Sequence, residues 1–427
     1  MSDFAVRYDE LTQETVYTMT HPTGVRIAVL PKPDYHTAYA VIGTKYGSID
    51  NDFSVNGGAF TRVPDGIAHY LEHKLFEDEE CGTYERFART GAAANAYTTY
   101  DKTCYYFTCT QDFEASLEIL LDFVQKPYFT EENVLKERGI IAQELSMYRD
   151  DPGWWVNHNL MSALYREHPI RIDIGGTEES IAQITPELLY RCYETFYSPN
   201  HLYLAVCGRV DPGRIAAICD RMLLPRENPT VVCRLPEDDG RVLLPTVEHE
   251  MDVSMPLFRL AFKEKWHEMS EREYTLARIV RSAVFGSMTD FYTRMTKENL
   301  INPSFGVGGL HLRGAAATML SGMSVSPERL REAIFEETER VKREGISPYL
   351  FECARRKTYG YMISVFNNVE DVGDDLVDDL MFDEDCFESL RAAAEVTVDE
   401  ANIWFRDHFD IANSAMSVVR SRRHKEA

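Results

Sequence analysis

The sequence has 427 residues, 44% hydrophobic and 27% charged, which is typical of a globular chain and predicts two or three domains. Its net charge of −24 excludes the basic surface that nucleic-acid-binding proteins need. Nine cysteines, an odd number without a Cys-x-x-Cys pair, predict neither a disulfide framework nor a thiolate zinc site. No signal peptide and no run of ~18 apolar residues is visible, so we expect no membrane span and a reducing cytoplasm.

Two segments near the N-terminus, residues 25–30 and 36–47, are rich in Val, Ile, Ala and Tyr and predict β-strands. A polar loop follows, and Pro64 with Asp65 predicts the start of a helix with Asp65 as its N-cap. This helix carries the spacing His-x-x-Glu-His.

The motif consists of His69, Glu72 and His73. On an α-helix, His73 and Glu72 lie about 40° and about 60° from His69, so all three leave one face. Leu71 and Leu75 lie on the opposite face and predict packing against a core. Two imidazoles beside a carboxylate are typical of a catalytic zinc helix, here in the inverted order. The alternative is a surface helix with two solvated histidines.

Residues 91–110 predict a β-hairpin with a turn at Asp101 and Lys102. Its first strand has small side chains at positions 92–96. They indicate either close packing against a helix or an exposed edge that another backbone can approach.

A helix predicted from Thr130 carries Glu137 and Glu144, which lie about 20° apart on one face because they are seven residues apart. A third metal ligand is needed, and local spacing does not choose it. Glu77 follows His73 by one helical turn, whereas Glu144 lies 71 residues downstream.

The region 224–244 is rich in Pro, Asp and Gly and predicts a linker. We therefore expect a catalytic domain over residues 1–230, a linker over 231–245 and a second domain over 246–427. The second half repeats the order of predicted elements: a strand at 255–264, a helix at 272–285, a hairpin at 305–325 and helices at 327–343 and after 348. It lacks the His-x-x-Glu-His motif, so a duplicated domain with a metal site in one copy is predicted.

These residues, together with the segments ERGIIAQE and GAAANAYT, resemble the pitrilysin/insulinase family of zinc metallopeptidases, which includes the mitochondrial processing peptidases. The resemblance covers most of the chain, is strongest over residues 20–215, and is closest to two-domain peptidases of Gram-positive bacteria. It implies an α+β fold of two homologous domains, each a mainly antiparallel mixed sheet with packed helices, and a bacterial cytoplasmic location.

The resemblance also implies the roles of the site residues. One zinc ion (Zn2+) per chain would be held by His69, His73 and Glu144. Glu72, whose place in the motif suits it to accept a proton from water at the metal, would be the base. Glu137 would be a supporting carboxylate behind the ligands.

For the peptide substrate, the resemblance implies that the strand through Asn95 and Ala96 binds it as an added β-strand. Family enzymes place an Arg and a Tyr from the opposing half over the substrate, and Thr296 and Phe305 stand at those positions here. Arg294 is near in sequence but a shift of two residues turns a side chain about 200° away. Either this half does not contact substrate, or a homologous zinc-free partner chain completes the enzyme as a heterodimer; a homodimer is the other arrangement.

The predicted function is that of a zinc-dependent metalloendopeptidase acting on small or unfolded peptides. Two alternatives remain open from the sequence: a non-catalytic scaffold or assembly subunit, and a peptide-binding module that assists a modifying enzyme.

Overall fold

The computed structural model describes residues 4–77 and 82–421, and the chain forms two compact units. The first comprises Met1–Leu145, Asp173–Leu235 and Ile363–Cys386, and the second Ser146–Ile172, Pro236–Met362 and Phe387–Ala427. Each unit therefore contains segments from both halves of the sequence. Within the described residues, no helix combines the length and apolar character needed to cross a membrane.

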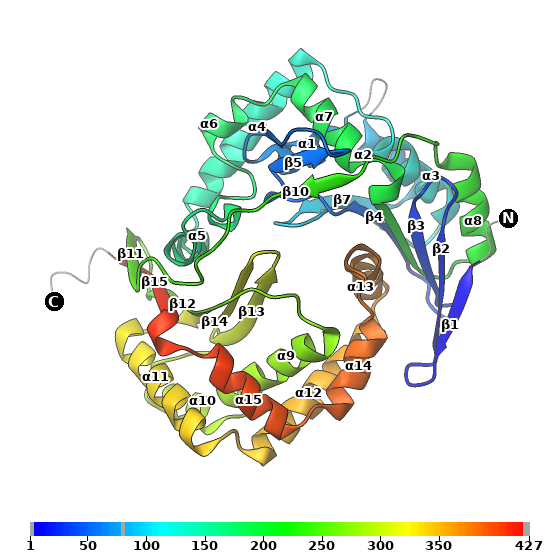
Figure 1. Cartoon of the computed structure of the whole chain (residues 1–427). Helices are drawn as coiled ribbons and strands as arrows, with labels where there is room; N and C mark the ends of the chain where they lie inside the picture. Colours follow the sequence, from blue (N-terminus) through cyan, green and yellow to red (C-terminus); the bar gives the residue numbers. More distant parts are fainter. Residues whose placement is uncertain (1–3, 78–81, 422–427) are drawn as a thin grey trace. The chain divides into compact units, whose positions relative to one another are not determined.

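The first unit is built on a seven-stranded sheet with the order β1-β2-β3-β9-β4-β8-β7 (Figure 1). All neighbouring strands are antiparallel except β3 and β9, which are parallel. A small second sheet has the order β10-β5-β6. The strands are β1 (Ala5–Asp9), β2 (Glu14–Thr20), β3 (Arg26–Pro31), β4 (Ala38–Thr44), β5 (Asp52–Val55), β6 (Thr61–Arg62), β7 (Ala93–Thr98), β8 (Thr103–Cys109), β9 (Leu202–Gly208) and β10 (Val231–Cys233).

Eight helices of the described residues belong wholly or mainly to this unit. They are α1 (Ile67–Leu75), α2 (Thr83–Thr90), α3 (Phe113–Val124), α4 (Glu131–Arg149), α6 (Glu178–Ile181), α7 (Pro186–Phe196), α8 (Pro212–Met222) and α13 (Val369–Phe382).

Strand β4 is buried along its whole length because helices cover both of its faces. Successive side chains of a strand point to opposite faces. Ala40 and Ile42 belong to the core that also contains Leu71 of α1. On the other face, Tyr39 Oη donates a hydrogen bond to Asp374 Oδ1 of α13 at 2.8 Å. The hydrophobic segment predicted as a strand is thus a central strand between two layers of helix.

The start of α1 differs from the prediction. Gly66, not Asp65, is the N-cap, with φ of 90° and no side-chain cap. A Cβ at Gly66 would lie 2.3 Å from Gly175 O, so only glycine fits this left-handed position. Asp65 instead accepts a hydrogen bond from Asn51 Nδ2 at 2.8 Å. Helix α1 is therefore oriented by a close backbone contact, which the N-cap pattern did not reveal.

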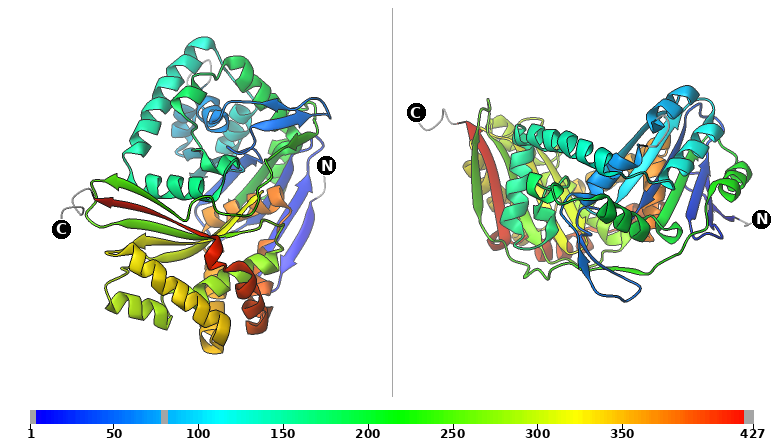
Figure 2. Two further views of the ribbon diagram at one scale, coloured as in Figure 1. Left: turned by 60° about the vertical axis from the view of Figure 1, so that its left-hand side comes forward. Right: turned by 90° about the horizontal axis from the view of Figure 1, so that it is seen from above.

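The second unit has a five-stranded sheet with the order β11-β15-β12-β14-β13. Figure 2 shows the red strand β15 beside β11, to which it is parallel; the other neighbours are antiparallel. Its strands are β11 (Thr246–Met251), β12 (Leu257–Glu264), β13 (Gly306–Leu312), β14 (Ala315–Met323) and β15 (Ser414–Ser421). Its helices are α5 (Pro152–Leu164), α9 (Glu271–Phe285), α10 (Asp290–Lys297), α11 (Pro327–Glu344), α12 (Pro348–Val365), α14 (Cys386–Glu395) and α15 (Val398–His408).

The order and directions of these five strands repeat those of β3-β9-β4-β8-β7 in the first unit. The predicted fold class, α+β with two similar domains of mainly antiparallel mixed sheet, is thereby confirmed. The predicted strand, helix and hairpin of the second half are present as β12, α9 and the β13–β14 pair.

The predicted domain ranges 1–230, 231–245 and 246–427 did not include an exchange of helices between the two halves of the sequence. Helix α5 comes from the first half of the sequence but contacts β11, β12 and β15 of the second unit. Helix α13 comes from the second half but contacts β3, β4 and β9 of the first. The division between Leu235 and Pro236 falls inside the predicted linker, and the linker's first residues form β10.

Candidate metal centre

Helix α1 holds the motif and is anchored on its far side. Leu71 and Leu75 are 0% and 1% exposed, as their spacing predicted. Tyr70 Oη donates a hydrogen bond to Val134 O of α4, which ties the two helices together. Helix α1 also contacts the edge strand β7 (Figure 1).

His69, His73 and Glu144 form a group whose potential ligand atoms all lie within 4.8 Å of one another. The Nε2 atoms of the two histidines lie 3.8 and 3.6 Å from Glu144 Oε2. Glu144 reaches them from α4, where it shares a face with Glu137. The structure thus brings together two neighbours on one helix and a carboxylate 71 residues further along the chain.

Glu137 lies behind this group rather than in it. Its Oε1 is 3.0 Å from His73 Nδ1, so the imidazole donates Nδ1–H to the carboxylate and leaves Nε2 facing Glu144. Partners of this kind orient metal-binding histidines. Glu137 is only 6% exposed.

The pKa shifts of the two histidines differ in direction, and only that of His69 favours the neutral, metal-binding imidazole. Burial, and then the neighbouring His73, lower the pKa of His69 to about 4, so its imidazole is neutral near pH 7. Burial opposes the charged form of Glu137, but the hydrogen bond with His73 outweighs it and lowers the pKa of Glu137. For His73, burial is likewise outweighed by the bond to Glu137, which raises its pKa.

A zinc ion fits this donor set. Two imidazoles and a carboxylate are ligands of catalytic zinc sites, and bonds of about 2.0–2.1 Å in tetrahedral geometry place donors about 3.3 Å apart. The separations of 3.6 and 3.8 Å are close to that value. The buried Nδ1 of His69 has no hydrogen-bond partner within the described residues, so this ring is not committed elsewhere.

Glu72 stands beside the group without belonging to it. Burial raises the pKa of Glu72, although a hydrogen bond from Thr98 lowers it. That bond joins Thr98 Oγ1 of β7 to Glu72 Oε2 at 2.8 Å. Thr98 was not predicted as a site residue. Because it follows Ala96 by two residues, it lies on the same face of the strand, and this position could have indicated that it lies near the site.

Strand β7 is the last strand in the order of its sheet, so within the described residues no strand pairs with its outer edge. Asn95 is exposed and Ala96 is half-buried. The Ala96 N–H donates to Asn95 Oδ1 at 2.9 Å. Both interpretations of the small side chains therefore hold: Ala92, Ala94 and Ala96 pack against the core, and the backbone of β7 forms an edge of the sheet.

Glu77, the rival third ligand, does not join the histidines. It accepts a hydrogen bond from Lys74 Nζ and is absent from the His/Glu group. Lys74 is fully buried and was not singled out in the sequence. Its position in the sequence, between His73 and the apolar residues Leu75 and Phe76, could have indicated that this lysine is buried.

The residues at the family's Arg and Tyr positions have other surroundings. Phe305 is 7% exposed and belongs to the hydrophobic core of the second unit. Thr296 Oγ1 donates to Tyr292 O one turn earlier in α10. Neither side chain can supply a guanidinium or phenol.

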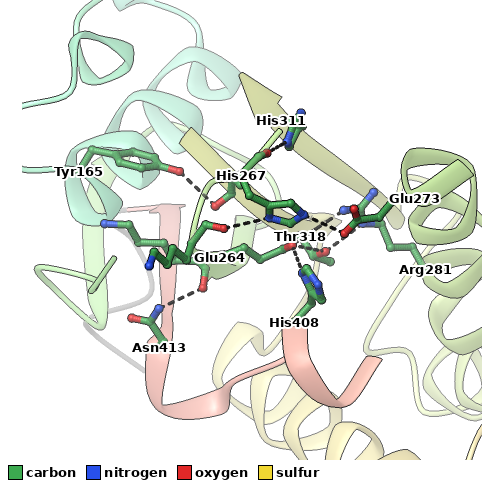
Figure 3. Close-up of polar contacts among 12 residues, drawn as sticks. Tyr165, Glu264, His267, Glu273, Arg281, His311, Thr318, His408 and Asn413 are labelled. Atoms are coloured by element: carbon green, nitrogen blue, oxygen red, sulfur yellow. Dashed lines mark hydrogen bonds and ion pairs between the residues drawn. The ribbon is translucent and has the colours of Figure 1, made fainter. Parts of the chain in front are cut away.

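The second unit contains a polar network instead of a metal group (Figure 3). Glu264, whose side chain is 3% exposed, accepts from Thr318 Oγ1 at 2.9 Å and contacts His408 Nδ1 at 2.6 Å. Arg281 of α9 donates from Nε to Thr318 at 2.9 Å. Buried charges of opposite sign thus compensate one another. Among the described residues, this unit has no His, Cys, Asp or Glu group that could hold a metal.

One further group in the first unit has the composition of a metal site: Asp379, Asp385 and Cys386. Its carboxylates already have protein partners. Asp385 is paired with Arg7 at 2.9 Å, and Asp379 accepts from the backbone N–H of Cys386 at 3.1 Å. We assign no function to it.

Comparisons with known proteins agree with this geometry. Residues 52–178 match the family described as Insulinase (Peptidase family M16), and residues 183–358 match the Peptidase M16 inactive domain. The chain is 35% identical over 410 residues to YmfH of Bacillus subtilis (strain 168), described as an uncharacterised zinc protease, covering 92% of this chain and 94% of that protein.

Among solved structures, an M16-like peptidase from Alicyclobacillus acidocaldarius matches with a TM-score of 0.92 and 32% identity, covering 98% of this chain and 99% of that one. A peptidase M16 inactive domain from Pseudomonas fluorescens matches with a TM-score of 0.80 and 15% identity, over 95% and 98% of the two chains, which supports the fold alone. The chain belongs to the insulinase family of peptidases, family M16.

Proposed function

We propose that this protein is a zinc-dependent endopeptidase that hydrolyses small or unfolded peptides. The proposal rests on the group of His69, His73 and Glu144 with Glu72 beside it. A bound zinc ion would supply Lewis acidity for activating water and polarising the scissile carbonyl. Glu72 would accept the proton of the attacking water and donate it to the leaving amine. Glu137 would hold His73 in orientation.

The substrate class follows from the edge strand. The hydrogen bond between Thr98 and Glu72 places β7 next to the proposed base. An extended peptide that adds to this edge would gain backbone hydrogen bonds, including one from the Ala96 N–H, which now donates to Asn95. Only a segment without secondary structure of its own can add in this way, so we expect unfolded or short peptides with little sequence preference.

The test is Glu72→Gln, which keeps the shape of the side chain and removes its basicity. We expect zinc content by metal analysis to stay at one per chain, while cleavage of a quenched fluorescent peptide library falls at least about 100-fold, the typical contribution of a general base. Glu132→Gln, at an exposed position in the first turn of α4, is the matched control and should leave cleavage unchanged. Undiminished cleavage by Glu72→Gln would contradict the mechanism.

We also propose that a homologous zinc-free chain is the partner, with a homodimer as the other arrangement. This is supported by the burial of Phe305 and the absence of a guanidinium at Thr296. Gel filtration and peptide cleavage, measured with and without a co-expressed paralogue, test it. Full activity from a purified monomer would contradict it. A bacterial cytoplasmic location stays a prediction.

The second candidate is a peptide-binding scaffold or assembly subunit, which the exposed edge of β7 would also serve. It predicts stoichiometric zinc and peptide binding but no cleavage, with or without a partner. The same library measurement separates the two functions.

A further inference from the structure

Lys74 is an unusual residue for the interior of a protein. It directly follows His73 on α1, and its side chain is 0% exposed. Lysine is almost never fully buried unless its charge is paired. The pairing partners should therefore reveal why a lysine is present where an apolar residue would pack more easily.

Lys74 Nζ has two carboxylate partners. It donates a hydrogen bond to Glu77, one turn further along the chain. It also lies 3.9 Å from Glu137 Oε2, too long for a hydrogen bond but close enough for a strong electrostatic attraction in a buried site. Glu77 thus anchors the ammonium group, and the ammonium group attracts Glu137.

Glu137 connects this ion pair to the metal centre. One of its oxygens, Oε2, faces Lys74, while the other, Oε1, accepts from His73 Nδ1 at 3.0 Å. The His73 ring then directs Nε2 toward Glu144 Oε2 at 3.6 Å. A continuous series of contacts, Glu77–Lys74–Glu137–His73, runs from outside the centre to one of its proposed ligands.

We propose that Lys74 is a positioning residue for the metal centre. It holds the Glu137 carboxylate in the orientation that fixes the His73 ring, and it offsets part of the negative charge that several buried carboxylates bring together. The inference rests on the proposed zinc site and adds a residue to it. Glu77 acts as the anchor of Lys74.

Two physical effects of Lys74 on zinc affinity have opposite signs. Direct repulsion between an ammonium group and a cation would make zinc bind more tightly once Lys74 is replaced. Loss of the Glu137 orientation would make zinc bind more weakly, since losing such outer partners typically costs about 10–100-fold in affinity. The sign of the change therefore discriminates between a positioning role and a merely nearby charge.

The experiment measures the zinc dissociation constant of the purified full-length chain by chelator competition, for the native protein, Lys74→Met, Glu137→Gln and the double variant. We expect Lys74→Met to weaken zinc binding about 10-fold in the native background. In the Glu137→Gln background the same substitution should change the affinity less than about 2-fold, because its route to His73 is gone.

Unchanged or tighter zinc binding by Lys74→Met would overturn the inference, and so would equal losses in both backgrounds. Circular dichroism of the zinc-free proteins checks folding. If Lys74→Met does not fold, Lys74→Gln, which removes the charge but keeps a polar group, is measured with the same expectation. If the native protein itself binds no zinc, the proposed function fails, whereas normal zinc binding by both variants refutes only the role of Lys74.

Discussion

At the scale of single residues, two carboxylates of α4 and one just beyond the end of α1 have different tasks because of where their neighbours lie. Glu144 and Glu137 share a face of α4, yet only Glu144 reaches both histidines, while Glu137 lies between His73 and Lys74. Glu77 has the helical spacing of a ligand but is held by Lys74. Side-chain partners, rather than spacing along one helix, separate these roles.

The comparison of Glu144→Gln with Glu77→Gln tests this separation. We expect Glu144→Gln to weaken zinc binding by about 10–100-fold or more, because it replaces a charged ligand with a neutral amide. Glu77→Gln should have a clearly smaller effect, since Glu77 acts only through Lys74. Equilibrium competition with a chelator measures both, and a larger loss for Glu77→Gln would reverse the assignment.

At the scale of elements, α13 is the helix that closes the second face of the first sheet. Its contact with β4 is close: a Cβ on Gly373 would lie 2.3 Å from Tyr39 Cδ1. The other end of the helix holds a carboxylate in an unfavourable place. Burial raises the pKa of Asp379 to about 7, while hydrogen bonds from Cys386 lower it.

This pKa predicts a pH dependence of stability. The folded state holds the Asp379 proton up to about pH 7, whereas the unfolded chain releases it near the ordinary aspartate pKa of 3.8. The contribution of Asp379 to stability is therefore present at low pH and is lost as pH rises through about 7. Asp379→Asn should remove this loss. The unfolding free energy of the variant minus that of the native protein should therefore be about 1–2 kcal/mol larger at pH 8 than at pH 5.5. Urea denaturation of both proteins at the two pH values measures it; identical pH profiles would contradict the prediction.

At the scale of the whole molecule, one sheet plan occurs twice and carries different chemistry each time. The first unit places two histidines of α1 near β7, and the second places Arg281 of α9 in a network with Glu264 and Thr318 (Figure 3). The exchanged helices α5 and α13 complete the sheet packing of each unit with a segment from the other half of the sequence. Neither half of the chain therefore contains all the elements of one unit.

Removal of zinc should affect the two units unequally. A ligand that binds only the folded state stabilises it by about 2.7 kcal/mol at a concentration 100 times its dissociation constant. Since the donor set lies in the first unit, chelation should lower the unfolding temperature of that unit and leave local stability in the second unchanged. Calorimetry combined with hydrogen exchange, with and without chelator, measures this. Equal loss of protection in β12 and β4 would show that the metal stabilises both.

Much of the site was predictable because it depends on local periodicity. Helical spacing placed His69, Glu72 and His73 on one face and Leu71 on the other, and a turn signal between two strand-like segments predicted the hairpin of β7 and β8. Spacing alone did not choose between Glu77 and Glu144; the resemblance to a family did.

The sequence by itself therefore determined that His69, Glu72 and His73 share one face of α1, and it indicated the strand, helix and hairpin that recur in the second half. The resemblance to a family had already implied Glu144, which the structure brings to the histidines, whereas only the tertiary structure decided that Lys74 pairs with Glu137. It also decided that Gly66 caps the helix and that α5 and α13 are exchanged between the units. The reason is physical: helical and strand periodicities act over a few residues, whereas these contacts join segments far apart in sequence and depend on how the faces pack.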